Sequence, residues 1–186
     1  CLVAMRSEAA YSGSGTFNQI ASTADITSGG YYVFVGGTTS TGMGLVVTSS
    51  ATPYALAIAS VATGTSIANP AADVVWRIDG NSTAWNVYSE TASYYIGQRG
   101  TVNGVSTAAS TAAAYGWTFA TTASSGFVIR NVASTLRMLR YNTQSPRFAC
   151  YSTGQNPIRL YKMQTPSITL ADNGTQVAAG NVSPGA

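Results

Sequence analysis

Three short runs of strand-forming residues recur along this chain at nearly constant spacing, and this recurrence restricts the possible folds more than any other feature. The runs are residues 30–36, 74–80 and 115–120. Each places a large aromatic residue beside alternating apolar residues and is closed by turn residues, which is typical of β-strands. The aromatic anchors Tyr32, Trp76 and Trp117 are 44 and 41 residues apart. The sequence therefore predicts an all-β fold built from repeated units.

Further strand-like runs follow each anchor, so the chain contains three units of three or four strands. A period of about forty residues is found in β-propeller blades and fits the units of a β-trefoil. Because propellers need at least about four blades, three units favour a β-trefoil-like fold, in which hairpins cap a small closed barrel. A two-sheet β-sandwich is the alternative. The fourth strands of units one and two, expected around 66–67 and 102–105, are weak, which argues against the trefoil.

The strand pattern divides the chain into three segments. Residues 1–25 lack sustained periodicity and include a Ser- and Gly-rich stretch, so we expect a flexible leader. Residues 26–163 hold the trefoil-like domain. Residues 164–186 are interpreted as a linker and the start of a further β segment, with Asn173-Gly174 at a hairpin turn. Because a lone hairpin is barely stable in water, we expect it to pair with the domain, with a neighbour, or with another copy as a donor strand.

The chain carries few charges. Charged residues make up 8% of the sequence, against about 25% in typical domains, and eleven Tyr, five Phe and three Trp argue against disorder. A surface of small and hydroxyl-bearing residues repels its copies weakly, as in wall-associated, fibrous or adhesive extracellular proteins. No stretch approaches the roughly 18–20 apolar residues of a membrane-spanning helix. We therefore expect a folded module, without a transmembrane segment, that tolerates close lateral contact.

Residues that most enzymes need are scarce. The sequence has no histidine, which removes the commonest general base, the commonest metal ligand and the centre of a Ser-His-Asp triad. Two cysteines cannot form a structural zinc site by themselves. Asp79 and Glu90 fall on consecutive expected strands and are the best candidates for a glycosidase pair, but Asp79-Gly80-Asn81 is an ordinary turn composition. We therefore expect no catalysis, no cofactor and no metal ion.

The two cysteines, Cys1 and Cys150, admit several interpretations. Cys1 fits the lipidated first residue of a mature bacterial lipoprotein, or a residue left by an accident of cleavage. A disulfide between the two cysteines is a further option. Strand alternation instead places Cys150 on the same face as Phe148, which favours a buried free thiol packed beside that ring.

Basic residues gather in the third unit. No acidic residue lies between Arg99 and Lys162, so this unit is expected to present a positive surface that binds nucleic acid or an acidic polysaccharide through charge and stacking. The candidate binding residues are Arg130, Arg137, Arg140, Arg147, Arg159, Tyr94, Tyr141 and Tyr151. The alternative is that the arginines occupy outward strand positions and only keep the sheet edge hydrated.

A neutral sugar would require aromatic platforms beside Asn or Asp side chains. The candidates for such platforms are Tyr31, Tyr88, Tyr94 and Tyr115. Trp76 and Trp117 are expected in the core instead, because they occupy equivalent repeat positions. The Gln-x-Trp signature of ricin-type sugar-binding trefoils is absent, so it gives no support to lectin function.

The end of the third unit has a recognisable sequence. Residues 137–151 read RMLRYNTQSPRFACY and residues 157–162 read PIRLYK. This ending resembles β-rich accessory domains of secreted and surface multidomain proteins of Bacteroidota, a type appended to extracellular nucleases and hydrolases. The opening at 26–32 is similar as well, and residues 168–185 look like the start of a further repeat domain. The resemblance implies a non-catalytic appendage that is extracellular or on the outer cell surface, and it supplies no ligand.

Two functions are therefore expected. The first is a non-catalytic extracellular structural or adhesive module that packs against copies of itself, as in a filament, or against neighbouring domains. The alternative is a carbohydrate- or polyanion-binding module of a secreted hydrolase. Salt distinguishes the two, because polyanion binding weakens steeply with salt whereas self-assembly should survive it.

Overall fold

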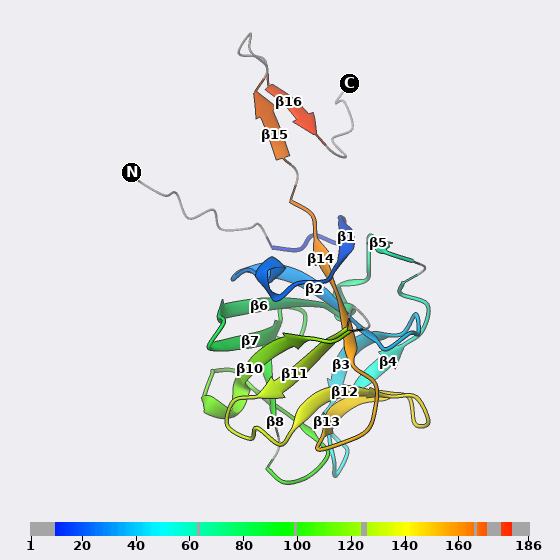
Figure 1. Cartoon of the computed structure of the whole chain (residues 1–186), viewed down its shortest axis with the longest axis vertical. Coiled ribbons are helices and arrows are strands. Elements are labelled where there is room, and N and C mark those ends of the chain that lie inside the picture. The colour runs from blue at the N-terminus through cyan, green and yellow to red at the C-terminus, as the bar shows by residue number, and fades with distance from the viewer. Residues whose placement is uncertain are drawn as a thin grey trace.

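Short strands joined by tight turns make up most of the molecule (Figure 1). The computed structural model describes residues 10–62, 64–98, 100–123 and 126–165, together with two strands further on. Short 3-10 turns lie between strands: η1 (Thr23–Asp25), η2 (Ala72–Val74) and η3 (Ala113–Tyr115). Among the described residues, no helix has the length and apolar character needed to cross a membrane. The prediction of an all-β fold is confirmed.

Six of the strands that the structure describes close into an antiparallel barrel. In barrel order they are β2 (Gly30–Gly36), β6 (Val75–Asn81), β7 (Ala84–Ser89), β10 (Gly116–Thr121), β11 (Phe127–Asn131) and β14 (Ile158–Met163). Each strand pairs with the next, and β14 pairs with β2 to complete the circle. A closed barrel has no free edge along its wall, which removes the main site of unwanted strand pairing.

Three hairpins of the described chain join one end of this barrel, on its lower side in Figure 1. Their strands are β3 (Gly42–Val47) with β4 (Tyr54–Ile58), β8 (Tyr94–Gln98) with β9 (Val105–Ala108), and β12 (Met138–Asn142) with β13 (Arg147–Tyr151). One hairpin is inserted between each pair of barrel strands β2 and β6, β7 and β10, and β11 and β14. This is the architecture of a β-trefoil, as the repeat spacing predicts, and not that of a two-sheet sandwich.

The boundaries of the repeated units differ from those expected. The equivalent pairs across barrel strands are Tyr32 with Trp76, Trp85 with Trp117, and Phe127 with Ile158. Tyr32 therefore faces Trp76 and is not its equivalent, so β6 ends unit one and does not begin unit two. The sequence alone does not show which barrel strand begins a unit, because both barrel strands of a unit carry a large buried residue at the same level.

The weak fourth strands have a related explanation. The short strand β5 (Ser66–Ala68) pairs with β1 outside the barrel, and β9 is a hairpin partner of β8 and not a barrel strand. The strands that close units one and two are β6 and β10, which have strong strand sequences. The weakness was therefore no argument against the trefoil.

Indole groups attach two hairpins to the barrel. Trp76 and Trp117 are fully buried, as expected for core residues. The Nε1–H of Trp76 donates to the carbonyl oxygen of Met43 at 2.9 Å, and that of Trp117 donates to the carbonyl oxygen of Ile96 at 3.0 Å. Because a buried indole N–H needs an acceptor, each bond satisfies the ring and holds a hairpin strand against the barrel wall.

The interpretation of 1–25 as a flexible leader is wrong for its second half. Residues Thr16–Ile20 form β1, which pairs with β14 on one side and with β5 on the other. Phe17 is fully buried in a second core cluster that includes Val33 and Tyr161, and the ring of Tyr11 packs edge-on against Phe17. The sequence of β1 has no alternation that marks a strand. The strand forms because β14 and β5, which are distant in the chain, pair with it on either side. The expected leader before residue 10 lies outside the described residues.

The segment after the barrel contains an antiparallel strand pair, as predicted. Strands β15 (Ser167–Leu170) and β16 (Gln176–Ala179) form a two-stranded sheet that is not part of the main sheet. The expected Asn173-Gly174 turn lies outside the described residues. The further-domain and donor-strand interpretations of this segment stay predictions.

Candidate functional site

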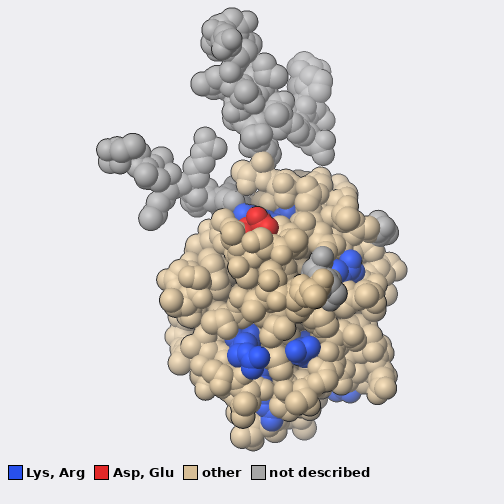
Figure 2. All heavy atoms as spheres, viewed as in Figure 1, with Lys and Arg blue, Asp and Glu red and all other residues tan. Residues whose placement is uncertain are grey.

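The third unit is strongly basic. Between Phe127 and Met163 the sequence has six basic residues and no acidic residue. In the face shown in Figure 2, basic groups gather on the lower half of the molecule, the side on which Figure 1 labels β12 and β13, and acidic atoms are seen near the upper rim. Within the described residues, both ion pairs are made by Arg77, in unit one. The third unit therefore has no internal carboxylate to balance its arginines.

Three of the five candidate arginines hold parts of the fold together. Arg159 donates through Nε to the carbonyl oxygen of Gly37 at 2.6 Å and through Nη2 to that of Thr39, which fixes the turn after β2. Arg137 donates to the carbonyl oxygen of Thr101 and to the side chain of Asn103.

Arg147 lies over the ring of Tyr54, with its Cζ 5.1 Å from the ring centroid. This contact crosses between β13 and β4, which pair in the sheet, so it joins the third hairpin to the first. Arg137, Arg147 and Arg159 therefore have structural contacts that use much of their donor capacity.

Arg130 and Arg140 are placed differently. Nη1 of Arg130, on β11, donates to the carbonyl oxygen of Thr135 in the loop between β11 and β12. Nη1 of Arg140 donates to the carbonyl oxygen of Gln155 at 3.1 Å, and Nη2 contacts the thioether sulfur of Met138 at 3.2 Å. Burial lowers the pKa of Arg140, and the nearby charge of Arg130 lowers it further. Of the five candidates, Arg130 and Arg140 thus lie on the paired strands β11 and β12, near enough for one charge to act on the other.

Two of the three tyrosines expected as stacking platforms are buried. Tyr141 is 4% exposed and packs against Phe148 with ring centroids 4.9 Å apart, and Tyr151 is 9% exposed. Tyr94 is half-buried, accepts a hydrogen bond from the backbone N–H of Val46 at 2.8 Å and packs beside Trp76. The prediction is therefore wrong for Tyr141 and Tyr151, because strand alternation alone does not show which loop or hairpin covers an aromatic side chain. For Tyr94 it stays a prediction.

The other proposed sugar platforms have mixed positions. Tyr31 is buried, whereas Tyr88 and Tyr115 are half-buried. Tyr88 lies against Tyr95, with ring centroids 4.6 Å apart, and the guanidinium of Arg77 sits 4.8 Å above the Tyr88 ring. The exposed parts of Tyr88 and Tyr95 form a small aromatic surface, but its faces are already used by each other and by Arg77.

The carboxylates of Asp79 and Glu90 are brought together, as their positions on consecutive strands suggested. Arg77 binds both: its Nη2 is 2.9 Å from Asp79 Oδ2 and its Nη1 is 2.8 Å from Glu90 Oε1. The hydroxyl of Tyr31 also donates to Glu90 Oε1, at 2.9 Å. The two carboxylates thus take part in an ion-pair network on the barrel. The turn that the local composition indicated is also present: β6 ends at Asn81, whose side-chain oxygen accepts from the backbone N–H of Thr83 at 3.0 Å in the turn to β7.

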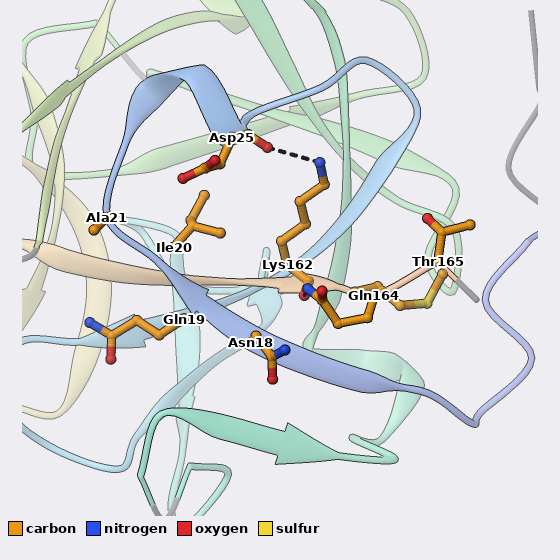
Figure 3. A pocket seen from close by; sticks show the side chains of 9 residues that line it. Asn18, Gln19, Ile20, Ala21, Asp25, Lys162, Gln164 and Thr165 are labelled. Carbon is orange, nitrogen blue, oxygen red and sulfur yellow. Dashed lines mark hydrogen bonds between the residues drawn. The ribbon is translucent and has the colours of Figure 1, made fainter. Parts of the chain in front are cut away.

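Sequence reasoning missed a polar hollow beside β1, drawn in Figure 3. Its volume is about 470 Å³, and it lies open to solvent between β1, η1 and the end of β14. The lining residues that carry polar side chains are Asn18, Gln19, Asp25, Lys162, Gln164 and Thr165. Most of this site falls in the segment expected to be a leader or at the end of the expected domain, so no sequence signal connected its two sides.

Hydrogen bonds fix several groups around the hollow. Lys162 reaches across it, and its Nζ donates to the carbonyl oxygen of Asp25 at 2.9 Å (Figure 3). The carboxylate of Asp25 accepts from the backbone N–H of Ser22 at 3.3 Å in a capping box that orders η1. The side-chain amide of Gln164 donates to the carbonyl oxygen of Lys162 at 3.0 Å. The hollow therefore combines amides, a carboxylate and an ammonium group on an ordered backbone.

The structure places one of the two cysteines, and its described residues can be searched for groups of metal-binding side chains. Cys150 is a free, fully buried thiol in the main core cluster with Phe148, as strand alternation favoured. Cys1 lies outside the described residues, so its lipidation stays a prediction. No cluster of three His, Cys, Asp or Glu side chains that could hold a metal ion occurs within the described residues.

Comparisons with known proteins identify the fold. No family model and no curated protein matches this sequence. A β-trefoil protein named BEL is similar over 75% of this chain and 96% of its own, with a TM-score of 0.55 and 12% identity. This likeness shows the β-trefoil fold. A Polyporus squamosus lectin, solved with a sialylated glycan epitope, matches over 77% of this chain at a TM-score of 0.55 and 11% identity.

A third similar structure is an endo-β-galactosidase from Clostridium perfringens, with a TM-score of 0.56, 7% identity and 73% of this chain covered. The match spans 33% of the galactosidase chain and 52% of the lectin chain. The trefoil thus corresponds to only a part of each of those proteins.

Proposed function

We propose that this chain is a non-catalytic carbohydrate-binding module and that it binds sugar in the polar hollow between β1, η1 and the end of β14. The observation that carries the proposal is the lining of that hollow, whose side-chain amides, carboxylate and ammonium surround a volume of about 470 Å³. Sites for small ligands have volumes of roughly 300–1,000 Å³. The hollow therefore has room for a short saccharide.

The lining has the chemistry that hydroxyl-rich ligands require. The amides of Asn18 and Gln164 can each donate and accept hydrogen bonds, the carboxylate of Asp25 accepts, and the ammonium of Lys162 donates. A sugar hydroxyl is both donor and acceptor, so adjacent hydroxyls can pair with such a mixed set. Because Asp25 is ordered by the capping box, its carboxylate needs little reorganisation on binding.

Two observations support a module without catalysis. The sequence has no histidine. The one carboxylate pair expected from sequence is bound by the single guanidinium of Arg77, so both carboxylates are already engaged within the fold. We further propose that the module belongs to a secreted or surface protein. The resemblance of residues 137–151 and 157–162 to accessory domains of secreted and surface proteins supports this. The similar structures named as a lectin and as an endo-β-galactosidase, each matched over part of its length, support the carbohydrate-binding role.

A glycan array probed with the full chain tests the proposal, and calorimetry with each positive glycan gives the affinity. Asn18→Ala and Gln164→Ala should each weaken binding about tenfold, as expected for a hydrogen bond removed from a polar site. Gln144→Ala, an exposed amide on the third hairpin, is the matched control and should bind normally. An array without positive glycans, or equal affinities for all variants, would contradict the proposal.

Self-association is a second candidate, favoured by one observation. Leu136 is 75% exposed, and Val132 on the same loop and Val102 on the neighbouring loop are also exposed. Arg137 holds these two loops together through its bonds to Thr101 and Asn103. Exposed apolar side chains grouped in this way are typical of contact surfaces. Light scattering of the purified chain should then show oligomers that Leu136→Ser disperses, whereas a monomer at all concentrations would reject this function.

A further inference from the structure

We propose that Arg130 and Arg140 form a second, separate binding site that takes an oxyanion, the sulfate or carboxylate group of an acidic polysaccharide. The site lies on the third unit, on strands β11 and β12, whereas the hollow lies between β1, η1 and β14. Binding at this site does not depend on sugar binding in the hollow.

Strand register brings the two guanidiniums to the same face of the sheet. Arg130 on β11 lies opposite Met138 on β12. Arg140 is two residues beyond Met138, so strand alternation returns it to that face. Diagonal neighbours of this kind are close enough for long side chains to meet. The backbone therefore places the two arginines as diagonal neighbours on one face of the sheet.

The surroundings do not neutralise this charge. The hydrogen bonds described for Arg130 and Arg140 go to backbone carbonyls and to a thioether, which is a weak acceptor. Nε of Arg140 is buried without a hydrogen-bond partner in the described part of the chain. The whole of unit three, from Phe127 to Met163, contains no carboxylate. A half-buried pair of like charges without a counter-charge is costly, and a bound oxyanion would remove that cost.

The chemistry of the guanidinium fits such a ligand. Its planar set of N–H donors pairs with two oxygens of a sulfate or carboxylate at once. The observations favour an acidic polysaccharide over nucleic acid. Single-stranded nucleic acid needs exposed aromatic rings, and Tyr141 and Tyr151 are buried. Duplex DNA needs a long series of phosphate contacts, and Arg137, Arg147 and Arg159 already bind the chain itself.

Binding of the full chain to three immobilised polymers tests the inference: heparin as the sulfated chain, polygalacturonate as the carboxylated chain, and duplex DNA. At about 0.1 M salt, where surface charges farther apart than about 10 Å are screened, the double variant Arg130→Gln/Arg140→Gln should lose at least tenfold in affinity for a bound polysaccharide. Arg137→Gln is the matched control, because it removes one charge from the same unit outside the pair, and it should lose less than twofold. Thermal unfolding of each variant checks that the fold is intact.

Arg130→Gln alone keeps the inference testable if Arg140→Gln does not fold, because Arg130 is the less enclosed of the two. Arg130→Lys retains the charge but not the planar donors, and it should lose part of the affinity. An equal loss for Arg137→Gln and the pair would show unspecific charge attraction and overturn the site, as would absence of binding to both polysaccharides. Tighter binding to DNA would overturn the ligand class. Neutral glycans on the array report on the hollow, whereas these acidic polymers report on the arginine pair, so failure of the hollow and failure of this site are distinguishable.

Discussion

Cys150 is a thiol enclosed by the core. Its side chain is fully buried, and burial raises its pKa well above the ordinary value for cysteine. Because the thiolate is the reactive form, N-ethylmaleimide at pH 8 should label Cys150 at least about 100-fold more slowly in the folded protein than in denaturant. Peptide mass spectrometry reads Cys150 separately from Cys1. Equal labelling in both states would mean that the core opens far more readily than its packing indicates.

Gly36 shows how closely residues meet where β2 passes the third hairpin. A Cβ added to Gly36 would lie 2.3 Å from Cγ of Tyr141, which is itself buried. Gly36→Ala should therefore destabilise the protein by about 1–3 kcal/mol through overpacking. Gly64→Ala is the control, because its Cβ would meet nothing within 4 Å, and its effect should stay within about 0.5 kcal/mol. Urea unfolding gives both values, and similar values would contradict the contact.

At the residue scale, sequence predicted identities of core residues better than those of binding residues. Trp76, Trp117 and Cys150 are buried as expected, because large apolar side chains on alternating strands have few other places to go. Tyr141 and Tyr151 are buried too, although their position among the arginines had suggested a stacking role at the surface. The sequence shows that arginines are concentrated in the third unit. Only the structure shows that Arg137, Arg147 and Arg159 connect separate parts of the fold, and that Arg130 and Arg140 lie on the same face of neighbouring strands.

Among the elements, β1 is the one whose importance the sequence hides. Phe17 is fully buried between β14 and β5 neighbours. Phe17→Ala should cost about 3–5 kcal/mol of the free energy of unfolding, as for other buried phenylalanines. Asn18→Ala, on the exposed side of the same strand, should cost less than about 0.5 kcal/mol. Denaturant unfolding that finds the two variants equal would restore the flexible-leader interpretation.

Element boundaries were predicted less well than element types. The repeat spacing led to the right fold, because three units with alternating apolar runs allow few closed arrangements. The starts of units two and three were misplaced by one barrel strand, since Tyr32 and Trp76 are partners across the barrel and both look like anchors. The hollow could not be predicted for the same kind of reason: Asn18 and Lys162 lie opposite each other in β1 and β14, and no local pattern connects residues so far apart.

For the molecule as a whole, buried phenols predict how stability depends on pH. Burial and the hydrogen bond to Glu90 raise the pKa of Tyr31 to about 12, and burial also raises the pKa of Tyr11, Tyr94 and Tyr161. A phenol whose pKa is raised on folding stabilises the protein fully below its unfolded pKa of 10.0. That contribution is lost as the pH rises through the folded value of about 12.

The free energy of unfolding should therefore fall steadily from about pH 10 upward. Tyr31→Phe removes one titrating group, so the decline should become shallower in that variant. Urea unfolding at several pH values between neutrality and pH 11 measures both slopes. An unchanged slope in Tyr31→Phe would show that its hydroxyl titrates equally in the folded and unfolded chains.

Closure of the barrel by β14 against β2 also has a consequence during synthesis. The ribosome releases β2 early, yet its closing partner emerges only after the third hairpin has been made. Until Ile158–Met163 leaves the exit tunnel, both β2 and β11 present open edges to any passing nascent chain. The vulnerable period of this protein is therefore set by translation time over most of its length, and a holdase chaperone would be needed most just before the last barrel strand appears.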